Sequence, residues 1–401
     1  MPSAPPLRLA VVLSHPTQYY SPWFRWVQAE TKLQLRVFYL WDFGISAQRD
    51  PKFQTTFRWD VDLLSGYESE FVPNVARDRG THHIRGLNNP EITARLAAWG
   101  PSAVLMFGYK SVTHLRVLAW ARRKSVPLHF RGDSHLLGRG ALPPATRLVL
   151  RLLFRQFAAF LPVGAANRAY FTALGVPERK LFLAPHAVNA AHFDPTRPAD
   201  RAAAEQLRRD LGLGSKTRVV LFAGKLVPEK QPAELLTAFI TLAQPETALV
   251  FVGEGPEKDR LIQIARAAPG PGTIHFLPFA NQSEMPSRYL LADLFVLPSR
   301  GHYETWGLAV NEAMHMGVPA LVSDRVGCQA DLVEAGKTGW VFRATDSLDL
   351  QAQLRAALDC LADPAQAALL RKRVQARIAG YTYTHATSGL LAALSSVGPP
   401  P

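Results

Sequence analysis

Short apolar runs alternate with longer stretches of helical pattern along the whole chain. The runs are rich in Val, Leu and Phe and end at Gly, Pro, Asp or His, which is typical of strands followed by turns. Strands separated by helical segments of this length indicate βαβ units and a parallel sheet. The predicted strands are 8–13, 33–39, 103–107, 128–130, 159–162 and 180–183 in the first half, and 218–222, 248–252, 273–276, 294–297, 320–322 and 340–342 in the second.

Two successive series of strands predict an α/β fold of two Rossmann-like, doubly wound parallel-sheet domains that face a cleft. We expect an N-terminal domain over residues 1–195 and a C-terminal domain over residues 196–380. Residues 381–401 should form a C-terminal helix that packs back on the N-terminal domain, followed by a frayed tail. The pattern places this helix over residues 383–394.

The segment between the two series also predicts a helix of its own. It contains two prolines and then an Ala-rich stretch, for which Asp200 is the expected N-cap and Gly212 the stop. The boundary between the domains should therefore lie within residues 190–215.

The composition excludes several classes of protein. A chain of 401 residues with 48% hydrophobic residues can form two cores, and 19% charged residues argue against disorder. The apolar runs fall far short of the ~18 residues of a membrane span, and the apolar stretch near the N-terminus is too short for a secretory leader. Two cysteines, Cys328 and Cys360, cannot form a disulfide framework, so we expect a reduced, cytoplasmic setting.

The net charge of +13 is distributed unevenly. Residues 1–195 contain 24 basic and 12 acidic residues, whereas residues 196–401 contain 21 and 20. The excess of +12 therefore belongs to the first half, which indicates an anionic partner there. A nucleic acid, a membrane surface and a phosphorylated substrate all fit this charge.

The most informative polar cluster follows the predicted strand 294–297. Glu304 and Glu312 are eight residues apart, about two turns along one helix face, with Glu304 at or before the helix start. Gly307 lets a ligand approach the backbone, and the free N–H groups of a first helical turn attract anions. On spacing alone, a simpler interpretation is favoured, in which Glu304 stabilises the helix dipole and Glu312 is solvated.

A second cluster follows the predicted strand 218–222. Gly224 allows close backbone approach, and Lys225 and Lys230 precede a helix start. Cations and N–H donors together suit a diphosphate. The segment lacks the G-x-x-x-x-G-K-[ST] pattern of a P-loop, and two solvated lysines in an ordinary loop remain an alternative.

Taken in order, the segments of the second half resemble the nucleotide-sugar domain of retaining GT-B glycosyltransferases of family 4. The matching segments are FAGKLVPEK, FVGEGPEKDRL, IHFLPFANQSEMPSRYLLADLFVLPS, ETWGLAVNEAM, GVPALVSD and GKTGWVF. Glu304 and Glu312 match the two glutamates of the family, which are separated by seven residues. Several motifs in the order of the family are more specific than any one alone, so the resemblance reverses the simpler interpretation of the two glutamates.

The resemblance implies a role for each glutamate and for the helix start between them. Glu312 would hydrogen-bond the ribose hydroxyls of the nucleotide. Glu304 would face the hydroxyls of the transferred sugar near the anomeric carbon. Backbone N–H groups around Gly307 and Leu308 would hold sugar or phosphate oxygens.

The resemblance also implies where the rest of the donor lies. Lys225 and Lys230 would neutralise the departing diphosphate beside Gly224, and the base would lie near Leu277 and Phe279.

Two positions depart from the pattern of the family. Lys225 stands where the family usually has Arg, so a point charge replaces a bidentate phosphate contact. The usual Gly-Gly-x-x-Glu reads Gly327-Cys328-Gln-Ala-Asp331, which places a side chain where close backbone approach is expected.

The resemblance implies a retaining glycosyltransferase with a nucleotide-diphosphate sugar as its donor. Cleavage at the anomeric carbon leaves an oxocarbenium-like centre and a diphosphate anion, which fixed lysines and a helix N-terminus can stabilise. The second half has no Asp-x-Asp pair, which argues against an obligatory metal–diphosphate bridge. We therefore expect a metal-independent enzyme without a cofactor, in which the nucleotide sugar is a co-substrate.

Polar residues also follow the strands of the first half, where ligands bind in doubly wound sheets. These acceptor-side candidates are His15, Gln18, Tyr109, Arg131, Asp133 and His135. Asp133 or His135 could orient or deprotonate an acceptor hydroxyl. A capping or loop role is the alternative for each of these residues.

Arg147, Arg151 and Arg155 recur every four residues beside leucines, which is the pattern of an interfacial helix. A core helix with a solvated charged stripe is the alternative. If this helix meets an anionic membrane, it explains why the basic charge is confined to the acceptor half. We therefore expect a glycan or lipid-linked acceptor and peripheral contact at the inner face of the cytoplasmic membrane, in cell-envelope polysaccharide or glycoconjugate synthesis.

Other functions remain as alternatives. A GT-B-shaped sugar-nucleotide epimerase would need acid and base carboxylates and no acceptor. A phosphorylase would need a longer chain. A non-catalytic sugar-binding protein or a basic nucleic-acid-binding module would explain the charge, but neither zinc-finger spacing nor an RNA-recognition motif is present, so no nucleic-acid partner is expected.

Overall fold

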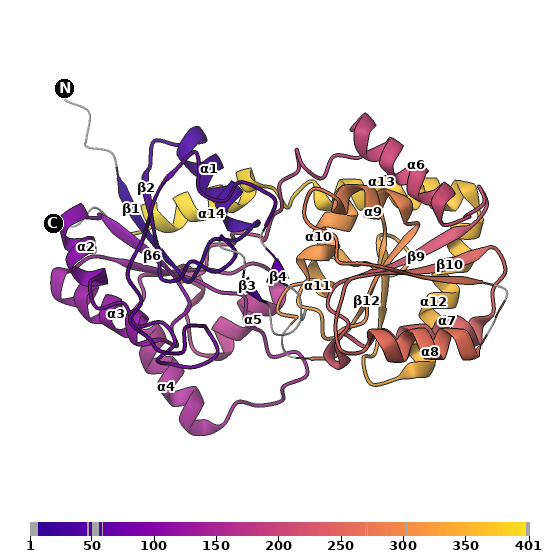
Figure 1. The fold of residues 1–401 in the computed structure, drawn as a ribbon. Coiled ribbons are helices and arrows are strands. Elements are labelled where there is room, and N and C mark those ends of the chain that lie inside the picture. The colour runs from indigo at the N-terminus through magenta and orange to yellow at the C-terminus, as the bar shows by residue number, and fades with distance from the viewer. Residues whose placement is uncertain are drawn as a thin grey trace.

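The computed structural model contains two α/β lobes that lie side by side (Figure 1). It describes residues 7–45, 48–49, 56–57, 59–268, 270, 272–301 and 304–397. The last four residues of the predicted frayed tail lie outside the described residues. In the part of the chain that the structure describes, no helix combines the length and the apolar character that crossing a bilayer requires.

The first lobe is built on a parallel sheet of six strands in the order β5–β2–β1–β6–β7–β8. Its strands are β1 (Arg8–Leu13), β2 (Gln34–Tyr39), β5 (Glu68–Phe71), β6 (Ala103–Phe107), β7 (Leu128–Arg131) and β8 (Ala159–Leu161). Its helices are α1 (Tyr20–Glu30), α2 (Ile92–Trp99), α3 (Val112–Lys124), α4 (Pro144–Phe154) and α5 (Ala165–Ala173), with a 3-10 turn η1 (Glu178–Lys180). A short antiparallel pair, β3 (Gln48–Arg49) and β4 (Thr56–Phe57), lies apart from the sheet.

The second lobe repeats the same topology with the strand order β11–β10–β9–β12–β13–β14. Its strands are β9 (Arg218–Ala223), β10 (Thr247–Val252), β11 (Thr273–Leu277), β12 (Leu294–Leu297), β13 (Ala320–Ser323) and β14 (Gly339–Phe342). Its helices are α6 (Pro198–Asp210), α7 (Pro232–Leu242), α8 (Lys258–Ala267), α9 (Met285–Leu291), α10 (Leu308–His315), α11 (Gln329–Leu332), α12 (Ser347–Ala362) and α13 (Pro364–Ile378), with a 3-10 turn η2 (Pro228–Lys230).

The inner strands of each sheet are buried on both faces, which explains why they read as continuous apolar runs. In β1, Ala10 and Val12 belong to the apolar cluster on one face of the sheet, whereas Leu9 and Val11 belong to the cluster on the other. The strands of the second lobe divide in the same way between two clusters. The predicted fold of two doubly wound parallel-sheet domains is therefore confirmed.

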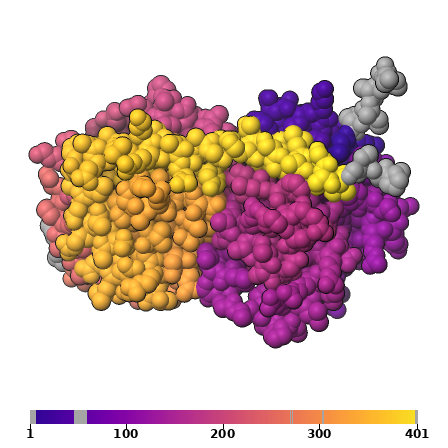
Figure 2. Space-filling view, turned by 180° about the vertical axis from the view of Figure 1, so that it is seen from behind, coloured from indigo at the N-terminus to yellow at the C-terminus, as the bar shows by residue number. Residues whose placement is uncertain are grey.

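The C-terminal helix α14 (Tyr383–Ser395) returns to the first lobe, as predicted. Figure 2 shows the end of the chain crossing from the second lobe to the first. Trp23 on α1 donates a hydrogen bond from Nε1 to Thr387 Oγ1 at 2.9 Å, and His129 Nε2 lies 3.2 Å from the Ala393 carbonyl oxygen. Helix α14 thus ties the two lobes together and completes the core of the first.

Three predictions of local structure were wrong. Residues 180–183 do not form a strand, because only a single bridge links Leu181 to Phe160 after the turn η1. Helix α6 begins at Pro198 rather than after an Asp200 cap, and Asp200 lies in its first turn beside Arg197. The edge strand β5 was missed because its sequence, ESEF, is mostly polar and exposed.

Candidate active site

A cavity of about 330 Å³ lies between the two lobes, beyond the carboxyl ends of their strands. The loops after β9 and β12 provide most of its second-lobe wall, and these strands are adjacent at the point where the strand order reverses. Ligands bind at this switch point in doubly wound folds. The first lobe contributes Gln18, Tyr19, Trp59 and Asp133.

Lys230 and Glu304 form an ion pair at the wall of this cavity. The two residues are 74 positions apart, yet Lys230 Nζ lies 3.0 Å from Glu304 Oε2. Ser299 donates a hydrogen bond from Oγ to the same carboxylate oxygen at 2.9 Å. Both side chains of the ion pair remain partly exposed, at 26% for Lys230 and 16% for Glu304, so a ligand in the cavity can contact them.

Gly224 and Lys225 lie beside this pair at the end of β9 and also line the cavity. The backbone of Gly224 has φ of +153°, and a Cβ atom there would lie 3.4 Å from Lys230 Nζ. The glycine therefore keeps the space beside the ammonium group open for a ligand.

The N-terminus of α10 opens into the same cavity. Gly307 precedes the helix with φ of +99°, and a Cβ atom there would lie 2.9 Å from Val326 Cγ1 and 3.0 Å from Leu297 Cδ2. Only glycine fits this position. No described side chain caps the helix, and Gly307, Leu308 and Ala309 all line the cavity. The N–H groups of Leu308 and Ala309 are therefore available to an anion, whereas Val310 N donates to the Gly307 carbonyl oxygen at 2.8 Å.

Glu312 lies one turn further along α10 and is only 2% exposed. Its carboxylate accepts a hydrogen bond from the Tyr289 hydroxyl at 2.7 Å, another from Gln282 Nε2 at 3.4 Å, and a third from the Tyr19 hydroxyl of the first lobe. Burial raises the pKa of Glu312 to about 7, although these three donors oppose the shift. The interpretation of Glu312 as a solvated carboxylate is therefore wrong.

The two residues predicted near the base are separated by the structure. Phe279 lines the cavity, whereas Leu277 ends β11 and its carbonyl oxygen accepts a hydrogen bond from Gly253 N at 3.2 Å. Of the two, only the Phe279 side chain is placed to contact a nucleotide in the cavity.

A second cavity of about 310 Å³ lies in the first lobe, beyond the ends of β1, β6 and β7. Tyr109 and Arg131 line it, together with Lys110. Asp133 lines both cavities, which makes it the point at which they meet. A group held in one cavity can therefore reach a group held in the other beside this carboxylate.

Asp133 is held in place from both lobes. Thr305 donates a hydrogen bond from Oγ1 to Asp133 Oδ2 at 2.8 Å, and His186 Nε2 lies 3.8 Å from the same oxygen. Burial alone would raise the pKa of Asp133, but the contacts with His186 and Thr305 outweigh it and lower the pKa below its ordinary value. Asp133 is therefore ionised at neutral pH.

The other acceptor-side candidates lie in different environments. His15 lines neither cavity and packs against Trp41 and Phe43, and burial lowers its pKa to about 4. Gln18 lines the cleft between the lobes. The buried Arg131 donates a hydrogen bond from Nη1 to the Ala184 carbonyl oxygen at 2.6 Å and lies over the Trp23 ring.

His135 contacts backbone groups with both ring nitrogens. Its Nδ1 accepts a hydrogen bond from Leu137 N at 3.1 Å, and its Nε2 lies 3.2 Å from the Glu304 carbonyl oxygen. The ring therefore links the first lobe to the loop that carries Glu304, and these contacts favour Asp133 over His135 as the group that meets an acceptor.

Trp59 and Asp60 are residues of the cleft that the sequence reasoning missed. Trp59 lines the cavity between the lobes, and both the backbone N–H and the hydroxyl of Ser283 donate hydrogen bonds to the Asp60 carboxylate. Their loop lies between β4 and β5 and carries no motif. The Trp-Asp dipeptide between the strands was the only signal in the sequence.

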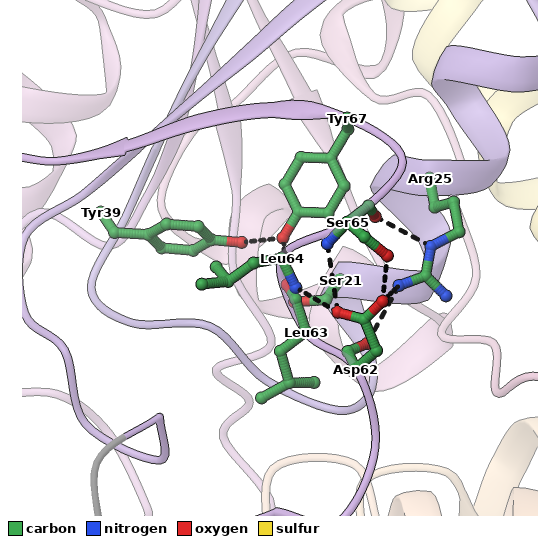
Figure 3. A network of polar contacts seen from close by, with 8 residues as sticks. All are labelled: Ser21, Arg25, Tyr39, Asp62, Leu63, Leu64, Ser65 and Tyr67. Carbon is green, nitrogen blue, oxygen red and sulfur yellow. Dashed lines mark hydrogen bonds and ion pairs between the residues drawn. The ribbon is translucent and has the colours of Figure 1, made fainter.

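A polar network fixes this loop to α1 (Figure 3). Arg25 on α1 donates hydrogen bonds to the carbonyl oxygens of Ser65 and Asp62, at 2.9 and 3.0 Å. The Asp62 carboxylate accepts hydrogen bonds from Ser65 and from the next backbone N–H groups, and Tyr67 joins the buried Tyr39 at 2.7 Å. The network positions the loop that brings Trp59 to the cleft.

Helix α4 presents arginines and leucines to the surface together. Arg147, Arg151 and Arg155 are exposed, as are Leu148 at 59% and Leu152 at 49% of their surfaces. Leu150 and Phe154 on the opposite side are buried in the core. The arginine stripe is therefore flanked by exposed apolar side chains.

The second departure from the family pattern, the segment from Gly327 to Asp331, lies near the interface of the lobes. Cys328 is fully buried, and its Sγ would lie 3.5 Å from a Cβ atom at Gly307. Asp331 accepts hydrogen bonds from Ala165 N at 3.0 and 3.1 Å, at the start of α5 in the first lobe. The acidic residue of this motif thus caps a helix of the opposite lobe.

The model of the family "Glycosyl transferases group 1" matches residues 203–374. The GDP-mannose-dependent alpha-(1-6)-phosphatidylinositol monomannoside mannosyltransferase of Mycolicibacterium smegmatis is 32% identical over 259 residues, which cover 63% of this chain and 64% of that protein. The D-inositol 3-phosphate glycosyltransferase of Nocardia farcinica is 33% identical over 209 residues, 50% of this chain and 44% of that protein. The chain thus spans less than two thirds of the length of either relative.

Among solved structures, the chain is similar to Anabaena Alr3699/HepE in complex with UDP and glucose. The TM-score is 0.72 at 18% sequence identity, and the match covers 98% of this chain and 100% of that one. This likeness extends over both lobes and confirms the predicted GT-B fold.

Proposed function

We propose that the protein transfers a sugar from a nucleotide-diphosphate sugar to a hydroxyl group of a glycan or lipid-linked acceptor, on the premise that residues 203–374 match the model of the family "Glycosyl transferases group 1". The observation that carries the proposal is the Lys230–Glu304 ion pair beside the open N-terminus of α10, with buried Glu312 further along the same helix. One cavity thus offers cations and N–H groups for a diphosphate and carboxylates for hydroxyl groups.

The geometry suits a donor that lies along α10. Glu312 accepts hydrogen bonds from the ribose, and the diphosphate lies between Lys230, Lys225 and the first turn of the helix. Glu304 contacts the sugar near its anomeric carbon. When the anomeric C–O bond breaks, its electron pair goes to the diphosphate oxygen, where fixed positive charge stabilises it without reorganisation.

The acceptor enters from the cavity of the first lobe and meets the donor at Asp133. The ionised carboxylate accepts a hydrogen bond from the acceptor hydroxyl and orients its oxygen toward the anomeric carbon. A C–O bond forms as the diphosphate leaves, and the proton of the hydroxyl passes to the departing diphosphate oxygen. Attack on the face from which the diphosphate departs retains the anomeric configuration.

The charge of the first lobe favours an anionic acceptor. Lys110 and Arg131 line its cavity, and the whole half carries the excess of +12. The names of the two relatives from Mycolicibacterium smegmatis and Nocardia farcinica specify phosphatidylinositol monomannoside and D-inositol 3-phosphate. Both of these compounds contain phosphate. A phosphate-bearing acceptor of the cell envelope therefore fits this chain.

Helix α4 supports peripheral contact with the cytoplasmic face of an anionic membrane. Leu148, Val149 and Leu152 are exposed beside the arginine stripe, so the helix can bury apolar side chains while its guanidinium groups meet phosphates. Sedimentation with phosphatidylglycerol-containing liposomes should fall when Arg147, Arg151 and Arg155 are replaced by Ser. The matched control replaces Arg355, Lys372 and Arg373 of the second lobe, which removes the same charge elsewhere. Equal binding by both triple variants would refute the contact.

A donor panel tests the proposed activity. Thermal shift with UDP-, GDP-, ADP- and TDP-sugars should show stabilisation by one nucleotide, because a ligand that binds only the folded state raises its stability. Glu312→Ala should abolish that shift. With the stabilising donor, product should form only when an acceptor is added. Conversion of the donor to an epimer without an acceptor would instead identify an epimerase, and stabilisation without any turnover would identify a binding protein.

A further inference from the structure

The loop between β5 and α2 carries a cluster of side chains of metal-binding type, of which His83 also lines the cavity of the first lobe. Asp78 and His82 are joined by a contact of 2.9 Å between Asp78 Oδ2 and His82 Nε2, and His83 Nε2 lies 3.2 Å from the same oxygen. The three ligand atoms lie within 4.8 Å of one another. We propose that Asp78, His82 and His83 form a site for a divalent transition-metal ion of the Zn²⁺ type. Binding of the metal ion to this site can be measured without any glycosyl transfer.

The backbone of the loop brings these side chains together. Gly80 N donates a hydrogen bond to the Gly86 carbonyl oxygen at 3.1 Å, which closes the loop between the aspartate and the end of the histidine pair. Asn74 Nδ2 donates to the same carbonyl oxygen at 3.0 Å, and Asn74 Oδ1 accepts hydrogen bonds from Ala76 N and Asn88 N. These hydrogen bonds hold the two ends of the loop together without an ion. Binding of an ion therefore needs to order few further residues.

The donor set and its spacing fit zinc. Tetrahedral Zn²⁺ has bonds of about 2.0–2.2 Å to nitrogen and oxygen, which place neighbouring ligand atoms roughly 3.3 Å apart. The Asp78–His82 and Asp78–His83 separations of 2.9 and 3.2 Å need to change by only a few tenths of an ångström, and the two histidine nitrogens lie within 4.8 Å of each other. Two imidazoles and one carboxylate select Zn²⁺ and related transition metals over Mg²⁺ and Ca²⁺, which prefer oxygen ligands. Three protein ligands leave a fourth position for water.

The surrounding charge sets the expected affinity. Arg77, Arg79 and Arg85 belong to the same loop and oppose the binding of a cation, whereas the site itself contributes a single carboxylate. All three ligands are at least partly exposed, so solvent screens this repulsion. We therefore expect micromolar rather than nanomolar affinity.

The site is connected to the second cavity through His83. This side chain lines the cavity of the first lobe, as do Gly80, Thr81 and Leu87 of the same loop. An ion bound to His83 would hold that wall in one conformation. The metal would therefore act on the shape of the cavity and would take no part in bond cleavage at the cleft.

Metal titration tests the site directly. Tag-free, chelator-treated protein should bind one equivalent of Zn²⁺ by isothermal titration calorimetry, and Co²⁺ should give visible absorption bands. Asp78→Asn, His82→Gln and His83→Gln should each weaken binding at least tenfold, as loss of one of three ligands does, while retaining polar side chains. His385→Gln on α14 is the control and should bind as the unmodified protein does. Absence of stoichiometric binding, or equal binding by all four variants, would overturn the proposal.

Limited proteolysis provides a readout of the loop itself. Trypsin cleaves after arginine. Arg77 precedes the three ligands, Arg79 lies between Asp78 and the histidines, and Arg85 follows them. Zn²⁺ should slow cleavage in this loop several-fold in the unmodified protein and leave the rate in His82→Gln unchanged, whereas Mg²⁺ should affect neither. Equal protection of both proteins would show that the ion binds elsewhere and would contradict the assignment.

Discussion

The two lobes share one strand order but use the ends of their strands differently. In the second lobe, the loops after β9 and β12 bring Lys230, Glu304 and the start of α10 to one point, and the half as a whole carries a net charge of only +1. In the first lobe, the loops after β1, β6 and β7 enclose a cavity, and the excess charge of +12 is spread over that half. The same strand order can therefore bring a few charged side chains to one point, where they stabilise a bound anion. It can also spread positive charge over a whole lobe, where it attracts an anionic partner.

The largest expected effect is the loss of kcat when Glu304 or Lys230 is replaced. Glu304→Gln and Lys230→Ala should each lower kcat by about 10²–10³-fold or more, because fixed electrostatic groups at the reacting centre contribute this much. The measurement is steady-state transfer with the donor identified by thermal shift. Glu234→Gln, which changes a carboxylate on the adjacent helix α7, is the control and should leave kcat unchanged.

A near-normal kcat in Glu304→Gln with intact folding would remove this residue from the reaction. The comparison would then fail, since the second lobe would hold the donor without acting on the bond that breaks.

The next effect tests the point where the two cavities meet. Asp133→Asn should lower transfer by about 10²-fold, as loss of a group that orients a reacting hydroxyl does, while donor binding by thermal shift stays unchanged. Thr305→Val removes the hydrogen bond to Asp133 from the second lobe and should have a smaller effect in the same direction. If Asp133→Asn weakens donor binding as strongly as transfer, the residue belongs to the donor site and the assignment of one lobe to the acceptor is wrong.

The pH dependence of donor binding tests the buried carboxylate. Burial raises the pKa of Glu312 to about 7, and only the ionised form can accept hydrogen bonds from both ribose hydroxyls. Donor affinity should therefore rise by about tenfold between pH 6 and pH 8, following the ionised fraction of a group with this pKa. Glu312→Gln should bind weakly and without this pH dependence, as measured by calorimetry. A pH-independent affinity in the unmodified protein would show that the carboxylate does not meet the donor.

The same raised pKa affects stability with the opposite sign. The folded protein retains the Glu312 proton at pH values where the unfolded chain has lost it, so the stabilisation is complete below the ordinary pKa of 4.5 and is lost as the pH rises through about 7. The difference in Tm between the unmodified protein and Glu312→Gln should therefore change between pH 4.5 and pH 7. Both effects arise in the second lobe, where the charge of the site is set by single residues.

The sequence predicted the second lobe better than the first for a physical reason. Glu304, Gly307 and Glu312 belong to one short segment, so helical geometry alone relates their positions. One partner of Asp133, Thr305, and one partner of Glu312, Tyr19, lie in the opposite lobe and are far away in sequence. No local pattern encodes such a contact, and it arises only when the two sheets face each other.

Errors of local structure also have particular causes. Pro198 and Asp200 are both helix-start signals, and proline at the first position prevailed over aspartate as a cap. The strand β5 pairs only at the edge of its sheet, so its residues did not need to be apolar. The loop with Trp59 is positioned by Arg25 and Asp62, whose contact no spacing rule could have suggested.

The smallest expected effect is that of replacing Trp59. This substitution tests where the boundary between donor binding and acceptor binding lies. This side chain belongs to the first lobe but lines the cavity that we propose holds the donor. Trp59→Leu should raise the donor KM several-fold with little change in kcat, since an aromatic wall stabilises the bound donor and its transition state alike. The control is Trp99→Leu, on α2 in the core of the same lobe, which should lower Tm without a selective effect on the donor KM. If Trp59→Leu changes the acceptor KM instead, the first lobe is reserved for the acceptor alone. If the donor KM rises as expected, the lobes divide the charge between them but share the donor site.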